Sequence, residues 1–392
     1  MPLPLHLLAL AVFAMGTSEF MLAGLLPDIA SDFGVTVATT GTLISAFAVG
    51  MIIGAPLVAA LARTWPRRTS LLGFTLAFAA AHVVGAVTTS FPVLFATRIV
   101  AAFANAGFLA VALTTAATLV PPDRKGRALA VLLSGTTVAT IAGVPGGAVL
   151  GTLLDWRATF WAVAALCLPA AVGILRGVPA GGTRDTATGG PSLRTELAQL
   201  RRPRLVLVML LGALVNAATF GSFTYLAPVV TDTAGLGELW VPVVLVLFGA
   251  GSLVGVTVAG RLSDQRPGLV IAVGGPLLLV GWPALALLAD EPVALCLLVL
   301  GQGALSFALG GTLITRVLYE ATGAPTMAGS YATAALNVGA ATGPLIAATT
   351  LHTGAGNLGP LWTSGLLVAV TLLVAGAFRT VLAPGRAAEA AR

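Results

Sequence analysis

Glu19 is the residue whose position most needs a chemical explanation. It lies within residues 5–27, an apolar run that reads LHLLALAVFAMGTSEFMLAGLLP. About 20 such residues can cross a bilayer as a helix, and a carboxylate at the centre of that helix costs about 2.5–3.5 kcal/mol on insertion scales. Glu19 is therefore expected to face a polar cavity, where it can take up and release a proton. The alternative is an acid that reaches the outer surface, since Glu19 lies about two turns before Pro27.

The composition places Glu19 in a membrane protein. Hydrophobic residues make up 57% of the chain and charged residues 9%, with a mean hydropathy of +1.00. Soluble domains carry about 25% charged residues. Charges this sparse and dispersed exclude a nucleic-acid-binding surface, despite a net charge of +6. Hydropathy predicts twelve transmembrane helices, at about residues 5–27, 39–62, 70–89, 93–120, 128–150, 158–176, 205–230, 240–261, 268–289, 293–315, 327–350 and 361–382.

The basic residues set the expected orientation in the membrane. All 20 lysines and arginines except Arg98 and Arg157 fall at the same side of the predicted helices. The positive-inside rule makes that side cytoplasmic, so both termini are expected inside. The longest polar stretch, 177–204, separates residues 1–176 from residues 205–392. We therefore expect two six-helix bundles joined by a cytoplasmic linker that contains a short surface helix.

The sequences of the two halves align when one is shifted by 201 residues. This shift aligns Pro27 with Pro228, at the ends of the first and seventh predicted helices. The same offset places Gly50 and Gly54 of the second helix on glycines of the eighth. A duplication of six helices is typical of transporters that alternate access by rocking two bundles about a central cavity. A channel or a non-transporting scaffold has no evident need for it.

Small residues line one face of the fifth predicted helix. Gly143, Gly147 and Gly151 recur every fourth residue, which brings them onto one helix face. A face without side chains lets a neighbouring backbone approach closely, whereas Pro145 removes a backbone donor and bends the helix. Glycine spacing alone is equally consistent with ordinary helix packing.

The twelve helices, the long central linker and the duplication together resemble the Major Facilitator Superfamily. Residues 135–157, which include Gly146, resemble the fifth-helix motif of the drug antiporters in that superfamily. Residues 98–105 resemble its fourth-helix pattern, which begins with arginine, although Ala102 replaces the usual glycine. The resemblance implies an all-α membrane protein of two six-helix bundles related by a pseudo-two-fold axis.

Two cytoplasmic loops carry a further part of the resemblance. The second-half loop, with Gly260, Asp264 and Arg266, resembles the superfamily signature G-x-L-x-D-R-x-G. The first-half copy keeps its basic pair, Arg67 and Arg68. It departs where the family has an acid and a glycine, at Arg63 and Pro66. In the family this acid latches the cytoplasmic ends of the helices, so the departure puts the first-half latch in doubt and leaves Asp264 as the candidate.

The resemblance narrows to one group of exporters. Residues 1–36, the block LARTWPRRTSLLGF and residues 313–344 resemble the chloramphenicol-resistance exporters of actinobacteria, and the likeness runs the full length of the chain. It implies proton-coupled export of chloramphenicol by alternating access, by a monomer in the bacterial cytoplasmic membrane, with no cofactor. Hydropathy and spacing indicate a transporter but do not indicate this substrate.

The resemblance also assigns roles to particular residues, because helices 1, 4, 7 and 10 line the cavity in this fold. Glu19 and Arg98 are the expected proton-coupling residues, and the alternative for Arg98 is an anchor at the outer interface. The candidate cavity residues, each of which could instead tie or pack helices, are Phe20, Asn105, Asn216, Phe220, Phe223, Tyr225 and Gln302. The expected conformational residues are Arg67, Arg68, Gly143, Pro145, Gly146, Gly147, Gly151, Gly260, Asp264 and Arg266. His82 is interpreted as a satisfied core residue of a helix outside the cavity.

Other functions remain open at this stage. The same fold could export another small amphipathic drug, a sugar or a nucleoside, could import its substrate, or could serve as a receptor. A strongly cationic drug is disfavoured because Glu19 would be its only deep counter-charge. The sequence shows no Walker-type motif and no convincing metal-ligand cluster, so ATP-driven transport, a metal cofactor and enzymatic activity are not expected.

Overall fold

Every regular element that the structure describes is a helix. The computed structural model describes residues 3–61, 65–119, 131–132, 134–136, 138–179, 193–262, 267–321, 323–324 and 327–379. Among these residues, eleven helices are long and apolar enough to cross a membrane. A further helix, α15 (Ala328–Ala348), has 21 residues and packs along α3 (Val37–Leu61), so it completes the twelve that hydropathy predicts.

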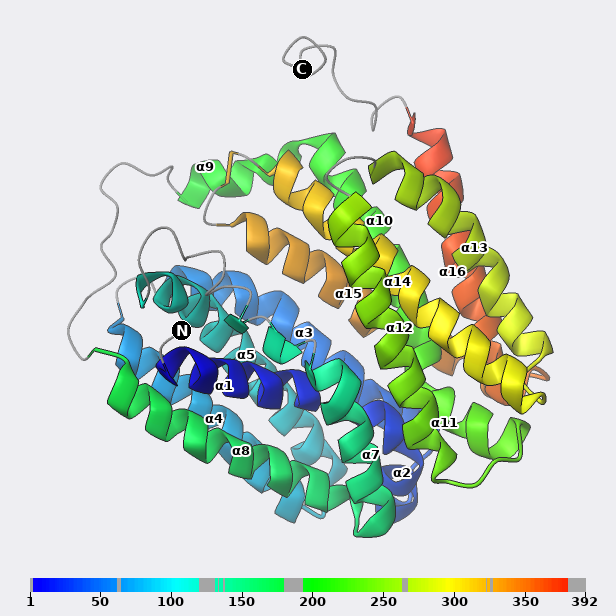
Figure 1. Ribbon diagram of the computed structural model, residues 1–392, viewed down its shortest axis with the longest axis horizontal. Coiled ribbons are helices and arrows are strands. Elements are labelled where there is room, and N and C mark those ends of the chain that lie inside the picture. Colours follow the sequence, from blue (N-terminus) through cyan, green and yellow to red (C-terminus); the bar gives the residue numbers. More distant parts are fainter. Residues whose placement is uncertain are drawn as a thin grey trace.

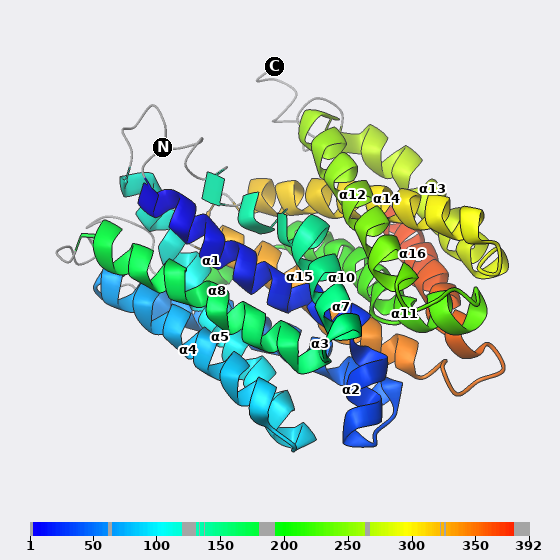
Figure 2. The same cartoon turned by 60° about the horizontal axis from the view of Figure 1, so that its bottom comes forward.

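The spanning helices form two groups (Figures 1 and 2). The first group contains α1 (Leu3–Phe20), α3, α4 (Arg67–Val87), α5 (Phe91–Thr118), α7 (Val144–Leu153) and α8 (Trp156–Gly177). The second contains α10 (Pro203–Thr224), α12 (Trp240–Leu262), α13 (Pro267–Leu287), α14 (Pro292–Glu320), α15 and α16 (Gly359–Ala377). Proline lies within the first two positions of α5, α10, α14 and α16, where its missing backbone donor has no partner to lose.

The first spanning helix ends earlier than hydropathy predicts. α1 stops at Phe20, a 3₁₀ turn (η1) covers Met21–Gly24, and a separate helix, α2, runs over Leu26–Phe33. The predicted first span is confirmed over Leu3–Gly24, but its α-helix does not continue to Pro27. Hydropathy misses the break because the residues on either side of it are equally apolar, and Pro27 lies in the first turn of α2, where proline is tolerated.

The seventh spanning helix breaks at the corresponding place. α10 ends at Thr224, and a short helix, α11 (Leu226–Pro228), is followed by a π-helical turn, η5 (Val229–Thr233). The offset of 201 residues places Gly24 on Tyr225, so both breaks occur at equivalent points of the repeat. The backbone thus repeats a feature that the hydropathy pattern does not show.

The two groups touch near the ends that the charge pattern assigns to the outside. Ser45 Oγ on α3 donates a hydrogen bond of 2.7 Å to the carbonyl oxygen of Ala341 on α15. Gly41 faces the hydroxyl of Tyr225, which donates to the carbonyl oxygen of Pro344 at 3.2 Å. These contacts hold the outer halves of α3 and α15 together.

Acidic side chains also gather at this outer end. Burial raises the pKa of Asp28 on α2, and the negative charges of Glu238 and Asp155 raise it further. Asp28 and Glu238 belong to different halves, so their repulsion opposes contact between the halves.

The linker contains a short helix that docks on the second half. α9 (Leu193–Leu197) continues into a 3₁₀ turn, η4 (Ala198–Arg201), close to the surface helix predicted within the linker. Glu196 is fully buried: its carboxylate accepts a hydrogen bond of 2.9 Å from the amide of Met327, and its carbonyl oxygen accepts one of 2.7 Å from the Tyr331 hydroxyl. These bonds attach the described end of the linker to the start of α15.

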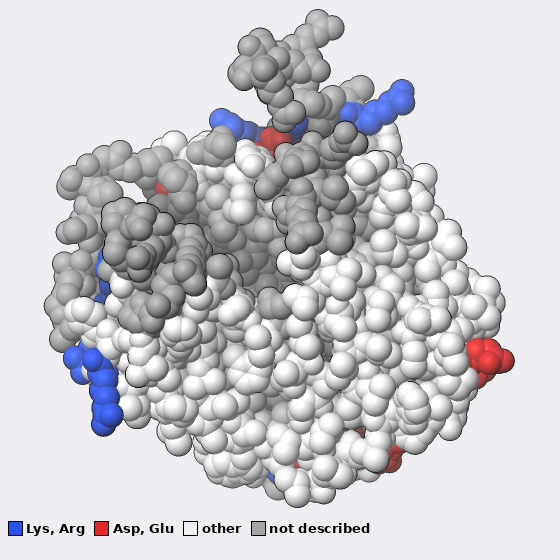
Figure 3. Space-filling model, viewed as in Figure 1, with Lys and Arg blue, Asp and Glu red and all other residues white. Residues whose placement is uncertain are grey.

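Charged side chains separate toward two ends of the molecule (Figure 3). Most of the visible basic side chains lie along the upper and left margins, and most of the visible acidic ones lie at the lower right. The surface between them carries few charges, as a surface in contact with lipid requires. Neither of the two arginines away from the basic side exposes an unpaired charge to lipid. Arg98 is buried, and Arg157 Nη1 lies 2.6 Å from Asp32 Oδ2.

The glycine face of the fifth spanning helix packs closely, as its spacing predicts. A π-helical turn, η3 (Ala139–Gly143), immediately precedes Pro145 in the first turn of α7. A side chain at Gly143 would meet Thr17, one at Gly147 would meet Met21 and Thr159, and one at Gly151 would meet Leu25. Thr17, Met21 and Leu25 are themselves four residues apart, so two matching faces meet. Gly146 faces open space.

Replacing Gly147 with leucine should therefore destabilise the protein, whereas replacing Gly146 with leucine should be tolerated. A Cβ at Gly147 would lie 2.9 Å from Thr159 Cγ2, and the Thr159 side chain is fixed by its 2.8 Å hydrogen bond to the Gly147 carbonyl. Overpacking of this kind costs about 1–3 kcal/mol. The midpoint of thermal unfolding in detergent measures the difference. Equal midpoints for the two variants would contradict the packing described here.

Candidate functional site

Arg98 is a fully buried cation within the first group of helices. Its side chain on α5 is 1% exposed. Nη1 donates to Ser18 Oγ at 2.8 Å, and Nη2 donates to the Ser18 carbonyl oxygen at 2.6 Å. The guanidinium also lies over the ring of Phe47 on α3, 4.7 Å from its centroid. Arg98 is thus not an anchor at the outer interface, since α1, α3 and α5 enclose its charge.

The break after α1 explains how Ser18 can hold this charge. The last four carbonyl groups of a helix have no partner within the helix, and Ser18 is one of the last residues of α1. A cation near a helix C-terminus is also stabilised by the helix dipole. Arg98 therefore satisfies a carbonyl that the early end of α1 leaves available, and two of its three guanidinium nitrogens, Nη1 and Nη2, find acceptors on Ser18.

His82 extends this contact to the third spanning helix. Its Nδ1 lies 2.8 Å from the carbonyl oxygen of Phe78, and its Nε2 lies 2.6 Å from Ser18 Oγ. A carbonyl only accepts, so Nδ1 carries a proton, and Nε2 of the neutral ring accepts from the Ser18 hydroxyl. The Ser18 oxygen in turn accepts from Arg98. Arg98 therefore donates to the Ser18 hydroxyl, and the Ser18 hydroxyl donates to His82.

Glu19 lies beside this chain and next to the junction of the two halves. It interacts electrostatically with Arg98. Glu19 and Phe20 are the only half-buried residues between Ala14 and Ala23, where all others are buried. An acid that keeps some exposure while a buried cation stands nearby can exchange a proton without losing its counter-charge.

Aromatic side chains close the space between the halves at the same level. The ring of Phe20 stacks on that of Phe220 across the junction, with centroids 5.6 Å apart. Phe220 contacts Phe223, which packs at 4.7 Å against Phe248. A hollow of about 10 Å³ remains between these rings, Thr219, Ser252 and Phe307, which is room for about one water molecule. A drug-sized molecule can bind here only when the rings move apart.

The three candidate amides lie in two kinds of setting. Asn105 on α5 is buried. Asn216 Nδ2 on α10 donates to the carbonyl oxygen of Leu336 on α15 at 2.6 Å, and Gln302 Nε2 on α14 donates to that of Leu278 on α13 at 3.3 Å. Asn216 and Gln302 thus tie helices of the second half together. Tyr225 is also buried and takes part in the contact at the outer end.

The candidate conformational residues on the basic side are described only in part. Arg67 and Arg68 begin α4 and are half-buried, and Gly260 lies in the last turn of α12. Asp264 and Arg266 lie outside the described residues, so their expected role stays a prediction.

Comparison with known proteins identifies the group to which this arrangement belongs. Residues 8–334 match the model of the Major Facilitator Superfamily. The chain is 78% identical over 392 residues to a chloramphenicol resistance protein of Streptomyces lividans, with 100% of each chain covered. It is 32% identical over 353 residues to the inner membrane transport protein YdhP of Escherichia coli (strain K12), with 90% of each chain covered.

Solved structures share the fold at low sequence identity. The nucleoside transporter NupG superimposes with a TM-score of 0.77 at 14% identity, covering 97% of this chain and 100% of that one. A bacterial homologue of the human lysosomal transporter Spinster, in an inward-facing and unoccupied conformation, gives a TM-score of 0.75 at 16% identity, covering 97% and 96%. These likenesses concern the fold alone. Together with the sequence matches, they identify a membrane transporter and not an enzyme.

Replacing His82 with phenylalanine should lower the stability of the folded protein, because the Ser18 hydroxyl would lose its acceptor. A buried polar group without a partner costs about 1–3 kcal/mol. Thermal unfolding can be followed with a thiol-reactive dye, since Cys167 is buried in the folded protein. In a Ser18→Ala background the same replacement should have a much smaller effect. An equal loss in both backgrounds would show that the two residues are not coupled.

Proposed function

Because this chain belongs to the Major Facilitator Superfamily, we propose that it exports chloramphenicol from the cell in exchange for protons. The observation that carries the proposal is the 78% identity to a chloramphenicol resistance protein along the full length of both chains. The site supports it, since an aromatic junction between two helix bundles suits a neutral aromatic drug. The same site offers one acid and one buried cation for proton exchange.

The two halves provide the means of transport. The outer ends of α3 and α15 are held together in this structure, and the aromatic rings of Phe20 and Phe220 meet at the junction. Transport requires a second arrangement in which the outer contacts part and the rings separate. We infer that chloramphenicol binds between the separated rings, where its nitrobenzene ring stacks on phenylalanine.

Glu19 and Arg98 provide the coupling. In the unprotonated state, the carboxylate of Glu19 faces the positive charge of Arg98 and can accept hydrogen bonds from the drug. Protonation removes the negative charge and leaves Arg98 held by Ser18 alone. Drug and proton therefore compete for the same group, and each binding event favours a different arrangement of the halves.

The proton gradient is sufficient for resistance. Moving one charge through 100 mV releases about 2.3 kcal/mol, and one pH unit adds about 1.4 kcal/mol. One proton exchanged for one neutral drug molecule can therefore hold the internal drug concentration about 10²- to 10³-fold below equilibrium. This multi-pass membrane protein would act as a monomer in the bacterial cytoplasmic membrane, with both termini inside.

Transport into everted membrane vesicles tests the proposal directly. Labelled chloramphenicol should accumulate in vesicles that contain the protein once a proton gradient is imposed, and an uncoupler should release it. Vesicles without the protein give the background. If folded, inserted protein gave no accumulation above that background, the substrate assignment would be wrong.

Replacing Glu19 with glutamine should abolish uncoupler-sensitive accumulation while the protein stays folded, because the side chain can no longer change its charge. Glu291→Gln is a matched control, since Glu291 is exposed in an outer loop. Binding of labelled drug to the purified Glu19→Gln variant should persist and lose its dependence on pH. Full proton-driven transport by this variant would remove Glu19 from the mechanism.

Replacing Phe220 with alanine should raise the drug concentration needed for half-maximal transport by about 3- to 10-fold, because one stacking surface is lost. Phe378→Ala serves as the control, since Phe378 is 49% exposed beyond the end of α16. A shift of the same size in both variants would mean that the junction rings do not contact the drug.

A further inference from the structure

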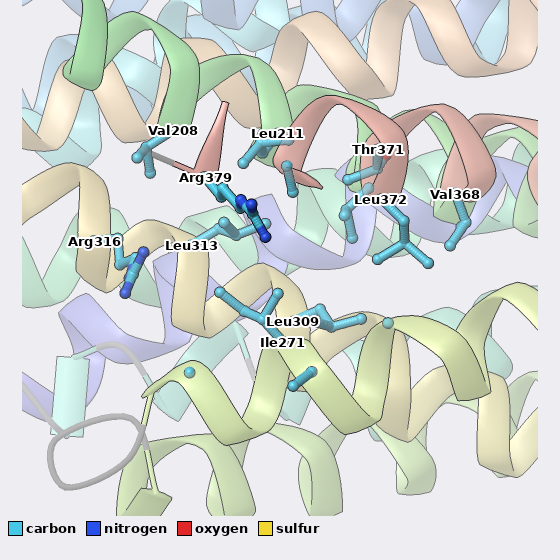
Figure 4. A pocket seen from close by; sticks show the side chains of 15 residues that line it. Val208, Leu211, Ile271, Leu309, Leu313, Arg316, Val368, Thr371, Leu372 and Arg379 are labelled. Atoms are coloured by element: carbon cyan, nitrogen blue, oxygen red, sulfur yellow. The ribbon is translucent and has the colours of Figure 1, made fainter. Parts of the chain in front are cut away.

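A second hollow lies within the second group of helices (Figure 4), and it shares no lining residue with the hollow at the aromatic junction. It has a volume of about 350 Å³, at the lower end of the roughly 300–1,000 Å³ typical of small-ligand sites. α10, α13, α14 and α16 all contribute to its walls, and each of these helices packs against two of the others. All of its lining residues belong to one half of the transporter, so it is not the cavity between the halves.

Each helix turns one regular face toward this hollow. Val208, Leu211 and Val215 follow the three- and four-residue spacing of one helix face on α10, and Ile271 and Gly275 do so on α13. The hollow is nearer to the basic ends of these helices, because α10 and α13 begin there and the α14 and α16 linings come from their last turns. This places it in the leaflet on the basic side of the membrane.

The lining is apolar except for two arginines at one end and Thr371, whose hydroxyl donates to the carbonyl oxygen of Leu367. Leucine, isoleucine, valine, alanine and glycine make up most of the wall. Arg316 on α14 and Arg379 just beyond α16 lie toward one end, opposite Val368 (Figure 4). Arg316 is half-buried and Arg379 is exposed, and neither forms an ion pair with any residue that the structure describes. The nearby acid at the end of α14, Glu320, is paired with Arg204 at 2.9 Å.

We propose that this hollow binds one anionic phospholipid of the basic-side leaflet, with an acyl chain between the four helices and its phosphate on Arg316 and Arg379. Guanidinium groups bind phosphate through paired hydrogen bonds, and apolar walls favour methylene groups over water. Free phosphate would not fill the apolar wall, and a neutral drug would not neutralise two arginines that have no ion-pair partner among the described residues. The combination fits a molecule with an anionic head and a long apolar tail.

Native mass spectrometry of the purified full-length protein in detergent tests this site. The protein is titrated with dioleoylphosphatidylglycerol and, in parallel, with dioleoylphosphatidylcholine, which has the same tails and no net charge. We expect one phosphatidylglycerol molecule to bind before any phosphatidylcholine does. The variant Arg316→Gln/Arg379→Gln should bind phosphatidylglycerol about 30-fold more weakly, since each surface arginine contributes about 1 kcal/mol to anionic lipid binding.

A matched double variant controls for charge alone. Arg176→Gln/Arg201→Gln removes the same charge from exposed residues on the same side of the membrane, outside the hollow. This variant should keep the tight phosphatidylglycerol molecule. Equal weakening in the two double variants would show general attraction to a basic surface and would overturn the proposal.

A third variant tests the place of the acyl chain. Ala272 lines the hollow, and Ala272→Phe fills part of it without changing any charge. This variant should also lose the tight lipid. Unchanged lipid binding by Ala272→Phe, together with displacement of the lipid by inorganic phosphate, would reduce the site to a surface anion site and overturn the proposal. Equal affinity of the wild type for the two lipids would do so as well.

Discussion

The burial of Arg98 constrains much of the first half of this protein. A guanidinium inside an apolar bundle needs acceptors, and the acceptors it finds belong to one residue, Ser18. Ser18 can offer its carbonyl group because α1 ends two residues later. The early end of the helix, which breaks an otherwise continuous apolar run, and the buried arginine are thus two parts of one feature. His82 completes it by accepting the Ser18 hydroxyl proton, so α1, α4 and α5 are fixed relative to one another.

The second half repeats the helix break but lacks counterparts of the polar residues that contact one another at the break in the first half. Spans one and seven break at equivalent positions, yet the offset of 201 residues places His82 on Pro283 and Arg98 on Val299. Glu19 falls on Phe220, the ring that stacks against Phe20. One half therefore carries the titratable group, and the other presents an aromatic surface at the same place. Under the proposed function, one proton site in the first half would be enough to drive the movement of both halves.

The sequence predicts the parts of this molecule that depend on one-dimensional patterns. Apolar runs locate the spanning helices, glycine spacing locates the close face of α7, and a charge inside an apolar run points to Glu19. Arg98 is singled out by the family resemblance of residues 98–105. The sequence does not predict Ser18 or His82 as partners, because a serine and a neutral histidine in apolar helices resemble ordinary packing residues. Their bonds join residues 64 and 80 positions apart, and no local pattern records such a distance. For Asn216 and Gln302 the sequence left two interpretations open, a cavity residue or a tie between helices, and their hydrogen bonds to neighbouring helices correspond to the second.

Under the proposed function, the division of contacts between and within the halves suggests how proton exchange would act on the parts that move. Arg98, Ser18, His82 and Phe47 all belong to the first half, so their bonds can persist while the halves rock. The Ser45–Ala341 bond and the Phe20–Phe220 stack cross the junction and must break. Glu19 directly precedes Phe20 and interacts with Arg98. It therefore lies between the Arg98–Ser18–His82 contacts within the first half and the Phe20–Phe220 contact between the halves. In the proposed mechanism, a change of charge at Glu19 would act on the last turn of α1, and the next residue along the chain, Phe20, makes one of the contacts between the halves.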